Sequence, residues 1–343
     1  MQSQYKHRVA LFTALCLFCS LIELAIPKPV FIRLGLSNVP VMLSIFCGFS
    51  LAEYSLLVIF RIISQALING TLFSYAFVLS AVAGISSAAV MFPLRRLRGI
   101  SFCGVSIAGA FVSNTVQTFT AILFLGKGVI RLFPVILGAG IVTSFLLGLF
   151  TDWFCRRSQF LKKLRDPAFV ASLVRPGYYD VNHRISWPYL LKVLFFSLVL
   201  CFCLFSRDIR ICGAICVFFL VMCIAGGRKI RVFPVVWLVL RTVFINVLMP
   251  SGRVLFSVGA FSVTQDAILS GIRRSIIMLT GTWFSRFVIP QSGEFEVAFS
   301  RQGVFYWTFA YYKAIVEKWF TESGRLIDRI DRTLVKALTE TNR

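Results

Sequence analysis

Residues 101–124 read SFCGVSIAGAFVSNTVQTFTAILF and contain no charged side chain. The hydrocarbon core of a bilayer is about 30 Å thick, and an α-helix needs roughly 20 apolar residues to cross it. This stretch is therefore long enough and apolar enough to form a transmembrane helix. The pattern extends outward from it, because residues 132–151 and 211–227 also contain no charged residue.

The composition of the whole chain agrees with a membrane location. Apolar residues make up 58% and charged residues 15%, and the mean hydropathy is +0.83. Average soluble domains are about 25% charged, and disordered chains are poor in apolar residues, so both classes are excluded. The sequence predicts an all-α polytopic membrane protein. We expect about ten spans, at residues 9–26, 39–49, 51–68, 72–93, 101–124, 131–151, 188–205, 211–226, 232–249 and 266–290.

The positive charges are concentrated in short segments between these spans. The chain has 36 Lys and Arg against 14 Asp and Glu, a formal net charge of +22. Short cytoplasmic loops of membrane proteins are rich in Lys and Arg. This rule predicts a multi-pass protein of the cytoplasmic (inner) membrane with both termini in the cytoplasm, and it makes nucleic acid an unnecessary explanation for the charge. The basic groups lie at 6–8, 95–98, 156–165 and 228–231.

The spans fall into two membrane halves of different character. Residues 1–153 hold six spans rich in small residues, and residues 154–187 form a basic cytoplasmic connector. Residues 188–299 hold about four bulkier spans. The polar tail, residues 300–343, has the helical spacing of apolar positions that predicts one or two amphipathic helices. These helices would lie on the membrane, on a partner protein or in solvent.

No enzymatic or metal-binding motif stands out. The ten cysteines lie mostly inside apolar segments, where Cys usually behaves as a small hydrophobe. The only histidines, His7 and His183, fall in basic segments that we interpret as loops. No P-loop or Asp-rich motif is present, so we expect no metal, no cofactor and no catalysis by this chain alone.

Polar residues inside the first half are the candidate binding residues. Ionisable groups in a bilayer usually face a cavity or a partner, because burying them in lipid is costly. The alternative is that each makes an interhelical hydrogen bond. Serines in this half, among them Ser80, Ser87 and Ser106, are interpreted as small residues that let helices approach closely. The candidate substrate-binding residues are Glu23, Asn38, Arg61, Asn69, Asn114 and Gln117.

Two further features suggest helix docking. Ala10 and Ala14 are four residues apart, a spacing that places small side chains on one helix face and suits close packing against another helix. In the second half, the adjacent pair Arg273 and Arg274 lies in a long apolar run. Such a pair indicates a steeply tilted helix or a protein interface. Residues 246–259 are interpreted as a turn-rich loop.

The first half resembles the Gx transporter family, also called heptaprenyl diphosphate synthase component I. The resemblance covers about residues 8–153. It implies a six-helix fold like the substrate-binding S components of energy-coupling factor (ECF) transporters, in which Ala10 and Ala14 would dock on a partner. It is carried by Leu34–Pro40, Arg61, Gly70, Phe73–Ser74, Phe77, Ser80, Gly104–Ala110, Asn114 and Gln117.

The second half is similar to the transmembrane T component of the same transporters, the CbiQ-like permeases, over about residues 184–290. T components contact ATPase subunits through cytoplasmic helices with Ala-Arg-Gly signatures. The nearest match here is Ser323-Gly324-Arg325, which departs from that pattern and makes Gly324 and Arg325 the candidates for ATPase coupling. The resemblance rests on Asn246–Gly252, Phe256–Gly259, Ser262–Thr264 and Gly271–Arg274.

Three functional hypotheses follow. Together the resemblances imply a fused S and T unit, an ABC-type importer that binds a small vitamin-like or precursor molecule, works with separate ATPase subunits and topples its S unit in the bilayer. The second hypothesis is a non-catalytic membrane subunit of heptaprenyl diphosphate synthase. The third is a membrane scaffold for an electron-transfer or flavin-modifying assembly. The polar and aromatic candidate residues suit flavins, thiamine-like rings and amphiphilic prenyl compounds alike.

Overall fold

The protein is an all-α polytopic membrane protein with one short β-hairpin. The structure is a computed structural model. Five helical stretches are long and apolar enough to cross a membrane, judged by length and composition. The structure describes residues 2–25, 35–94, 97, 99–164, 194–195, 198–199, 202, 206, 208–228, 232–248, 254–258, 261–288, 303–322 and 326–341.

Nine of the ten expected spans overlap helices that the structure describes. The N-terminal bundle comprises α1 (Gln2–Ala25), η1 (Leu36–Asn38), α2 (Val39–Phe46), α3 (Leu51–Ile68), α4 (Tyr75–Leu94), α5 (Phe102–Leu125), η2 (Lys127–Leu132) and α6 (Phe133–Arg157). It is followed by α7 (Gln159–Leu164), α10 (Ile209–Ala225), α11 (Val232–Val247) and α12 (Gln265–Val288). The span expected at 188–205 lies largely outside the described residues, as does most of the 154–187 connector.

Local sequence explains where several helices begin. Ser50 precedes α3, and its hydroxyl accepts a hydrogen bond from the backbone N–H of Glu53, whose carboxylate accepts one from the N–H of Ser50. This reciprocal arrangement satisfies backbone donors that a helix start leaves free. Ser101 caps α5 through the N–H of Gly104. Prolines in the first turns of α2 and α6 suit positions that need no N–H.

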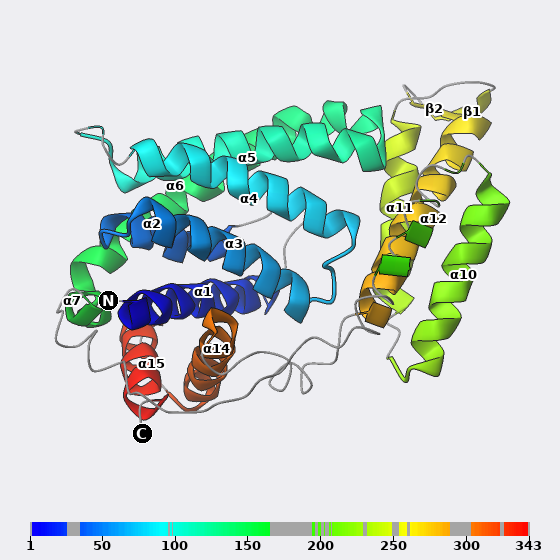
Figure 1. Ribbon diagram of the computed structural model, residues 1–343. Coiled ribbons are helices and arrows are strands. Elements are labelled where there is room, and N and C mark those ends of the chain that lie inside the picture. Colours follow the sequence, from blue (N-terminus) through cyan, green and yellow to red (C-terminus); the bar gives the residue numbers. More distant parts are fainter. Residues whose placement is uncertain are drawn as a thin grey trace.

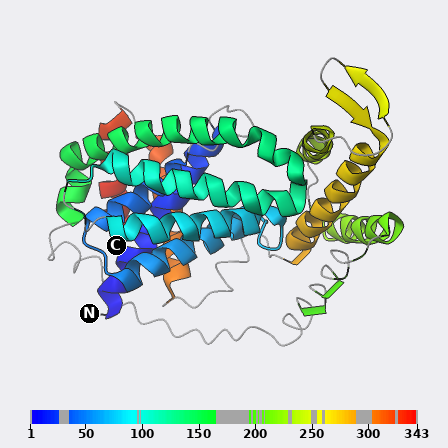
Figure 2. The same ribbon diagram turned by 90° about the horizontal axis from the view of Figure 1, so that it is seen from above.

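The helices form two groups that run crosswise to each other. The long helices of the N-terminal bundle lie side by side, and α10, α11 and α12 cross one end of that bundle (Figure 1). In the turned view, α10 and α11 are seen nearly end-on while α4, α5 and α6 are still seen from the side (Figure 2). The ends of α5 and η2 therefore abut the flank of α11 rather than continuing alongside it.

The tail contains two helices, which agrees with the amphipathic spacing. α14 (Val304–Thr321) and α15 (Leu326–Thr341) pack on α1 and α7 within the chain. Tyr311 and Ile315 are buried in the same core as α1. Asp331 of α15 accepts hydrogen bonds of 2.6 Å from the hydroxyl of Ser158 and from the N–H of Gln159.

The placement of His7 in a loop is wrong. His7 lies in α1 with 4% of its surface exposed, and its Nδ1 is 2.9 Å from the hydroxyl of Tyr311. Helix α1 begins before the apolar run, and α14 covers its first turns, so a polar segment becomes a buried helix end. Burial raises the pKa of the Tyr311 phenol, which keeps this hydroxyl protonated.

The interpretation of residues 246–259 as loop is wrong in part. β1 (Val254–Val258) pairs antiparallel with β2 (Phe261–Thr264). Val and Phe favour extended backbone, and two such runs separated by a short Gly-containing step are typical of a hairpin. Among the described residues, these two strands are the only regular structure that is not helical.

Candidate functional site

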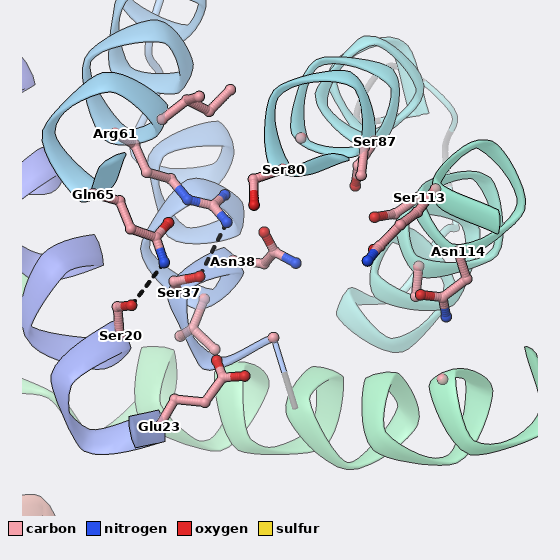
Figure 3. A pocket seen from close by; sticks show the side chains of 18 of the residues that line it. Ser20, Glu23, Ser37, Asn38, Arg61, Gln65, Ser80, Ser87, Ser113 and Asn114 are labelled. Atoms are coloured by element: carbon pink, nitrogen blue, oxygen red, sulfur yellow. Dashed lines mark hydrogen bonds between the residues drawn. The ribbon is translucent and has the colours of Figure 1, made fainter. Parts of the chain in front are cut away.

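A polar cavity lies inside the N-terminal bundle, between α1, η1, α3, α4, α5 and α6. Its volume is about 360 Å³, which is the size of a small-molecule site. We call it the bundle cavity. Side chains from separate helices converge on it, with Arg61 and Asn38 on one side and Ser80, Ser87 and Ser113 facing them (Figure 3).

The cavity gathers every residue proposed as substrate-binding. Glu23 comes from the end of α1 and Arg61 from the middle of α3, so the set spans four different elements. The structure brings these side chains together, and their role as ligands for a substrate stays a prediction. The six are Glu23, Asn38, Arg61, Asn69, Asn114 and Gln117.

Two hydrogen bonds fix the side chains of Arg61 and Gln65 in the wall of the cavity. Arg61 donates from Nη2 to the hydroxyl of Ser37 at 3.0 Å, and Gln65 donates from Nε2 to the hydroxyl of Ser20 at 2.8 Å (Figure 3). Arg61 and Gln65 are one turn apart and share a helix face. Among the described residues, no carboxylate lies within 4.0 Å of the Arg61 guanidinium.

Sequence reasoning missed the hydroxyl lining of the cavity. Ser80 and Ser87 were interpreted as packing residues, and they line the cavity instead, although Ser87 also lies close to Gly109. The signal was present in the spacing, since polar residues seven apart fall on one face of a helix. The missed polar residues include Ser20, Ser37, Gln65, Ser80, Ser87 and Ser113.

The proposed docking and coupling residues lie away from the cavity. Ala10 and Ala14 have no exposed surface and belong to the core that α1 shares with α3 and α14. The face of α1 that carries these two alanines is therefore buried by other helices of the same chain. Gly324 and Arg325 lie outside the described residues. Neither role is tested by the geometry.

A seam of hydrogen bonds joins the bundle to the C-terminal helices. Asn246 donates from Nδ2 to the carbonyl oxygen of Leu125 at 2.9 Å, at the end of α5. Arg274 approaches the carbonyl of Ile122 with Nη1 at 3.5 Å, while Arg273 donates to the carbonyl of Ser206 at 2.7 Å. The last carbonyls of a helix lack partners in the helix and attract cations. Arg274 therefore contacts the bundle, whereas Arg273 bonds within the C-terminal half. The choice between a tilted helix and a protein interface stays a prediction.

The seam encloses a second, smaller cavity of about 190 Å³, which we call the seam cavity. It lies between α4, α5 and α6 on one side and α11 on the other. Arg241 of α11 lines it and donates from Nη2 to the hydroxyl of Tyr75 at 2.6 Å. The bundle cavity and the seam cavity share Ala76, Asn114, Gln117 and Gly140 in their walls.

This chemistry suits binding of a polar solute. Hydroxyls and amides donate and accept hydrogen bonds, and the two charged side chains of the bundle cavity, Glu23 and Arg61, are of opposite sign. Within the regions that the structure describes, no group of three or more His, Cys, Asp and Glu is placed to hold a metal ion. The cavity can therefore orient a solute by hydrogen bonds and charge.

Comparison with known protein families assigns the two halves separately. Residues 12–154 match the family of heptaprenyl diphosphate synthase component I. Residues 190–291 match a domain of unknown function (DUF8519). The comparisons with curated proteins and with solved structures gave no match.

Proposed function

We propose that residues 12–154, which match the family of heptaprenyl diphosphate synthase component I, are the solute-binding part of an ECF-like, ABC-type membrane transporter. In this proposal the bundle cavity binds one small polar molecule. The C-terminal helices serve as the membrane scaffold, and separate ATPase subunits supply the energy. The chain itself catalyses no reaction.

The single observation that supports this proposal most is the polar cavity inside an apolar bundle. Burying unpaired polar groups costs free energy, and ionisable groups within a bilayer usually mark a pathway or binding site. Here a guanidinium, a carboxylate, amides and hydroxyls from several helices surround one space of about 360 Å³. A bundle that needed only to pack would fill that space with apolar side chains.

The crosswise arrangement of the helices supports movement of the bundle (Figure 1). If α10, α11 and α12 stand across the bilayer, the long helices of the bundle lie along it. The same apolar helices are long enough to stand upright in a bilayer. We propose that the bundle alternates between these orientations and so carries its cavity from one face of the membrane to the other. Both termini would then be cytoplasmic.

A second candidate function rests on the description of the family. Its members are named as a component of heptaprenyl diphosphate synthase, so the chain is alternatively a non-catalytic membrane subunit of that enzyme. This alternative requires a prenyl synthase subunit as the partner. The hydroxyl- and amide-rich cavity favours a polar solute over a long prenyl chain, which would need apolar walls.

Affinity purification of the tagged full chain from its native membrane distinguishes the two. The transporter proposal predicts ATPase subunits among the co-purified proteins in mild detergent. Recovery of a prenyl synthase subunit without any ATPase would contradict it and support the alternative. Purification at a second detergent concentration controls for partners that dissociate.

A further inference from the structure

The two cavities contain two arginines that lack an ion-pair partner. Arg61 lines the bundle cavity and Arg241 the seam cavity. Among the described residues neither has a carboxylate within 4.0 Å, and the Nε of each is buried without a hydrogen-bond partner. Arg8 of the same bundle also has a buried Nε without a hydrogen-bond partner, but it differs in having an ion pair, because Glu53 lies 3.5 Å from its Nη1.

An oxyanion would complete the environment of either arginine. A buried charge is costly unless it is paired, and guanidinium binds carboxylate and phosphate through parallel charged hydrogen bonds. Each of the two arginines has one Nη group hydrogen-bonded to a neutral hydroxyl, that of Ser37 or that of Tyr75. The other nitrogens of the fork can therefore turn to a ligand.

The cavities are adjacent rather than independent. Asn114 and Gln117 of α5 line both, together with Ala76 and Gly140. A solute that moves from one cavity to the other therefore passes two amide side chains. These side chains can change rotamer without disrupting a helix. Amides can hydrogen-bond an oxyanion on either side as it passes.

The charges of the two cavities differ. Among the described wall residues, the charged ones of the bundle cavity are Glu23 and Arg61, of opposite sign, whereas Arg241 is the one charged residue of the seam cavity. Coulomb interactions are strong in the low-dielectric interior. An anionic group in the bundle cavity is therefore attracted toward the seam.

We propose that the solute carries an oxyanion group, carboxylate or phosphate, and that Arg61 and Arg241 are two successive binding positions for that group. This inference rests on the proposed function and deepens it. The C-terminal half is then more than a scaffold, because α11 contributes a ligand-binding residue of its own.

The test uses the full chain in lipid nanodiscs at constant ionic strength. The probes are inorganic phosphate, acetate and the neutral acetate analogue acetamide, and the thermal midpoint against probe concentration gives an apparent Kd. We expect phosphate or acetate, and not acetamide, to stabilise the wild type. Stabilisation by phosphate alone would assign a phosphate group, and stabilisation by acetate alone a carboxylate. Equal stabilisation by acetamide would overturn the proposal.

Variants locate the binding. Arg61→Gln and Arg241→Gln are each expected to weaken anion binding by roughly tenfold or more, because each removes a charged hydrogen-bonding partner. Arg210→Gln is the matched control, since Arg210 is an exposed residue of α10 outside both cavities. Unchanged anion binding by folded Arg241→Gln would overturn the proposal.

Tyr75→Phe separates a binding role of Arg241 from a structural one. It removes the same seam hydrogen bond as Arg241→Gln but keeps the guanidinium. We expect Tyr75→Phe to bind anions within about threefold of the wild type. Loss of binding equal to that of Arg241→Gln would mean that Arg241 only ties the halves together. Such a result would leave the transporter proposal standing if ATPase subunits still co-purify.

Discussion

Arg61 contributes a positive charge to the polar wall of the bundle cavity. Its guanidinium is held by the hydroxyl of Ser37 and faces amides and hydroxyls rather than apolar side chains. Arg61 and Gln65 of α3 and Asn69, which follows the last residue of α3, recur every fourth position and therefore form one polar stripe along that helix and its C-terminal end. The stripe explains why one helix contributes so much of the polar wall.

A substitution of Gly140 tests whether the amide of Asn114 in the wall of the bundle cavity contributes to solute binding. A Cβ at this position would occupy the place of the Asn114 Nδ2, so Gly140→Ala must push the flexible amide aside. We predict solute binding weaker by roughly threefold to tenfold, the effect of one hydrogen bond of about 0.5–1.5 kcal/mol. Equilibrium binding of the retained solute, once it is identified, measures the change.

Gly138→Ala is the matched control on the same helix. Nothing lies within 4 Å of a Cβ at residue 138. Alanine also favours helix over glycine by about 0.8–1.0 kcal/mol, so neither variant should lose thermal stability. Equal binding by the two variants would show that Asn114 does not contact the solute.

The charged and amide residues of the bundle cavity could be predicted from the sequence, whereas its hydroxyl residues were missed. Costly groups such as Glu23 and Arg61 stand out inside an apolar segment. Serine is inexpensive in a membrane helix, because its hydroxyl can bond to a carbonyl of its own helix, as Ser86 does to Val82 at 2.7 Å. The residue type of Ser80 and Ser87 is therefore compatible with packing as well as with cavity lining, and only their seven-residue spacing on one helix face favours the cavity.

Among the elements, η2 and α11 approach each other closely at the seam. A Cβ on Gly128 would collide with the backbone carbonyl of Ile245, which cannot move aside as a side chain can. Glycine at residue 128 thus allows the end of the bundle to approach α11 closely, next to the hydrogen bond between Asn246 and Leu125. Close backbone approach is a common role of glycine.

Gly128→Ala is predicted to destabilise the seam by about 1–3 kcal/mol, the usual cost of overpacking. Thermal unfolding and amide hydrogen exchange around η2 measure the effect. The control is Gly213→Ala in α10, where no atom lies within 4 Å of an added Cβ. If both variants unfold at the same temperature, η2 and α11 are not in the contact described here.

The helices themselves could be predicted because length and hydropathy decide them. The expected span at 51–68 coincides with α3, and the spans at 101–124 and 232–249 differ from α5 and α11 by a residue or two at their ends. The hairpin formed by β1 and β2 was missed, because a short apolar segment beside Pro and Gly residues is typical of turns as well as strands.

For the whole molecule, the helix α1 of the bundle and the helix α14 of the tail pack against each other. The hydroxyl of Tyr311 in α14 lies 2.9 Å from Nδ1 of His7 in α1, and Trp307 packs against the same imidazole with ring centroids 4.3 Å apart. This contact joins residues 304 positions apart in sequence. It places α14 of the tail against α1 of the bundle.

Tyr311→Phe removes the hydroxyl while keeping the ring. It leaves the buried imidazole of His7 without this partner, and we predict a loss of about 1–3 kcal/mol in stability. Tyr306→Phe is the control, because the structure gives no hydrogen bond for its hydroxyl, and it should change stability by less than about 0.5 kcal/mol. Faster amide exchange in both α1 and α14 would identify the loosened contact, and unchanged exchange would contradict it.

The crosswise arrangement of the two halves could not be predicted from hydropathy. Hydropathy gives the length of each span and treats every span as upright, whereas the seam depends on particular residues such as Asn246 and Gly128 meeting across the chain. The same limit applied to His7, whose burial depends on a helix that follows some 300 residues later.

Native mass spectrometry of the full chain, released from mild detergent, tests most directly the claim that the bundle cavity binds a small polar solute. We predict that the wild type retains a small molecule and that Arg61→Gln loses it by at least about tenfold. Arg156→Gln should retain it, since the Arg156 side chain is 77% exposed and pairs with Asp152. Retention of the same molecule in equal amount by Arg61→Gln, or a wild-type protein with an empty cavity, would contradict the account.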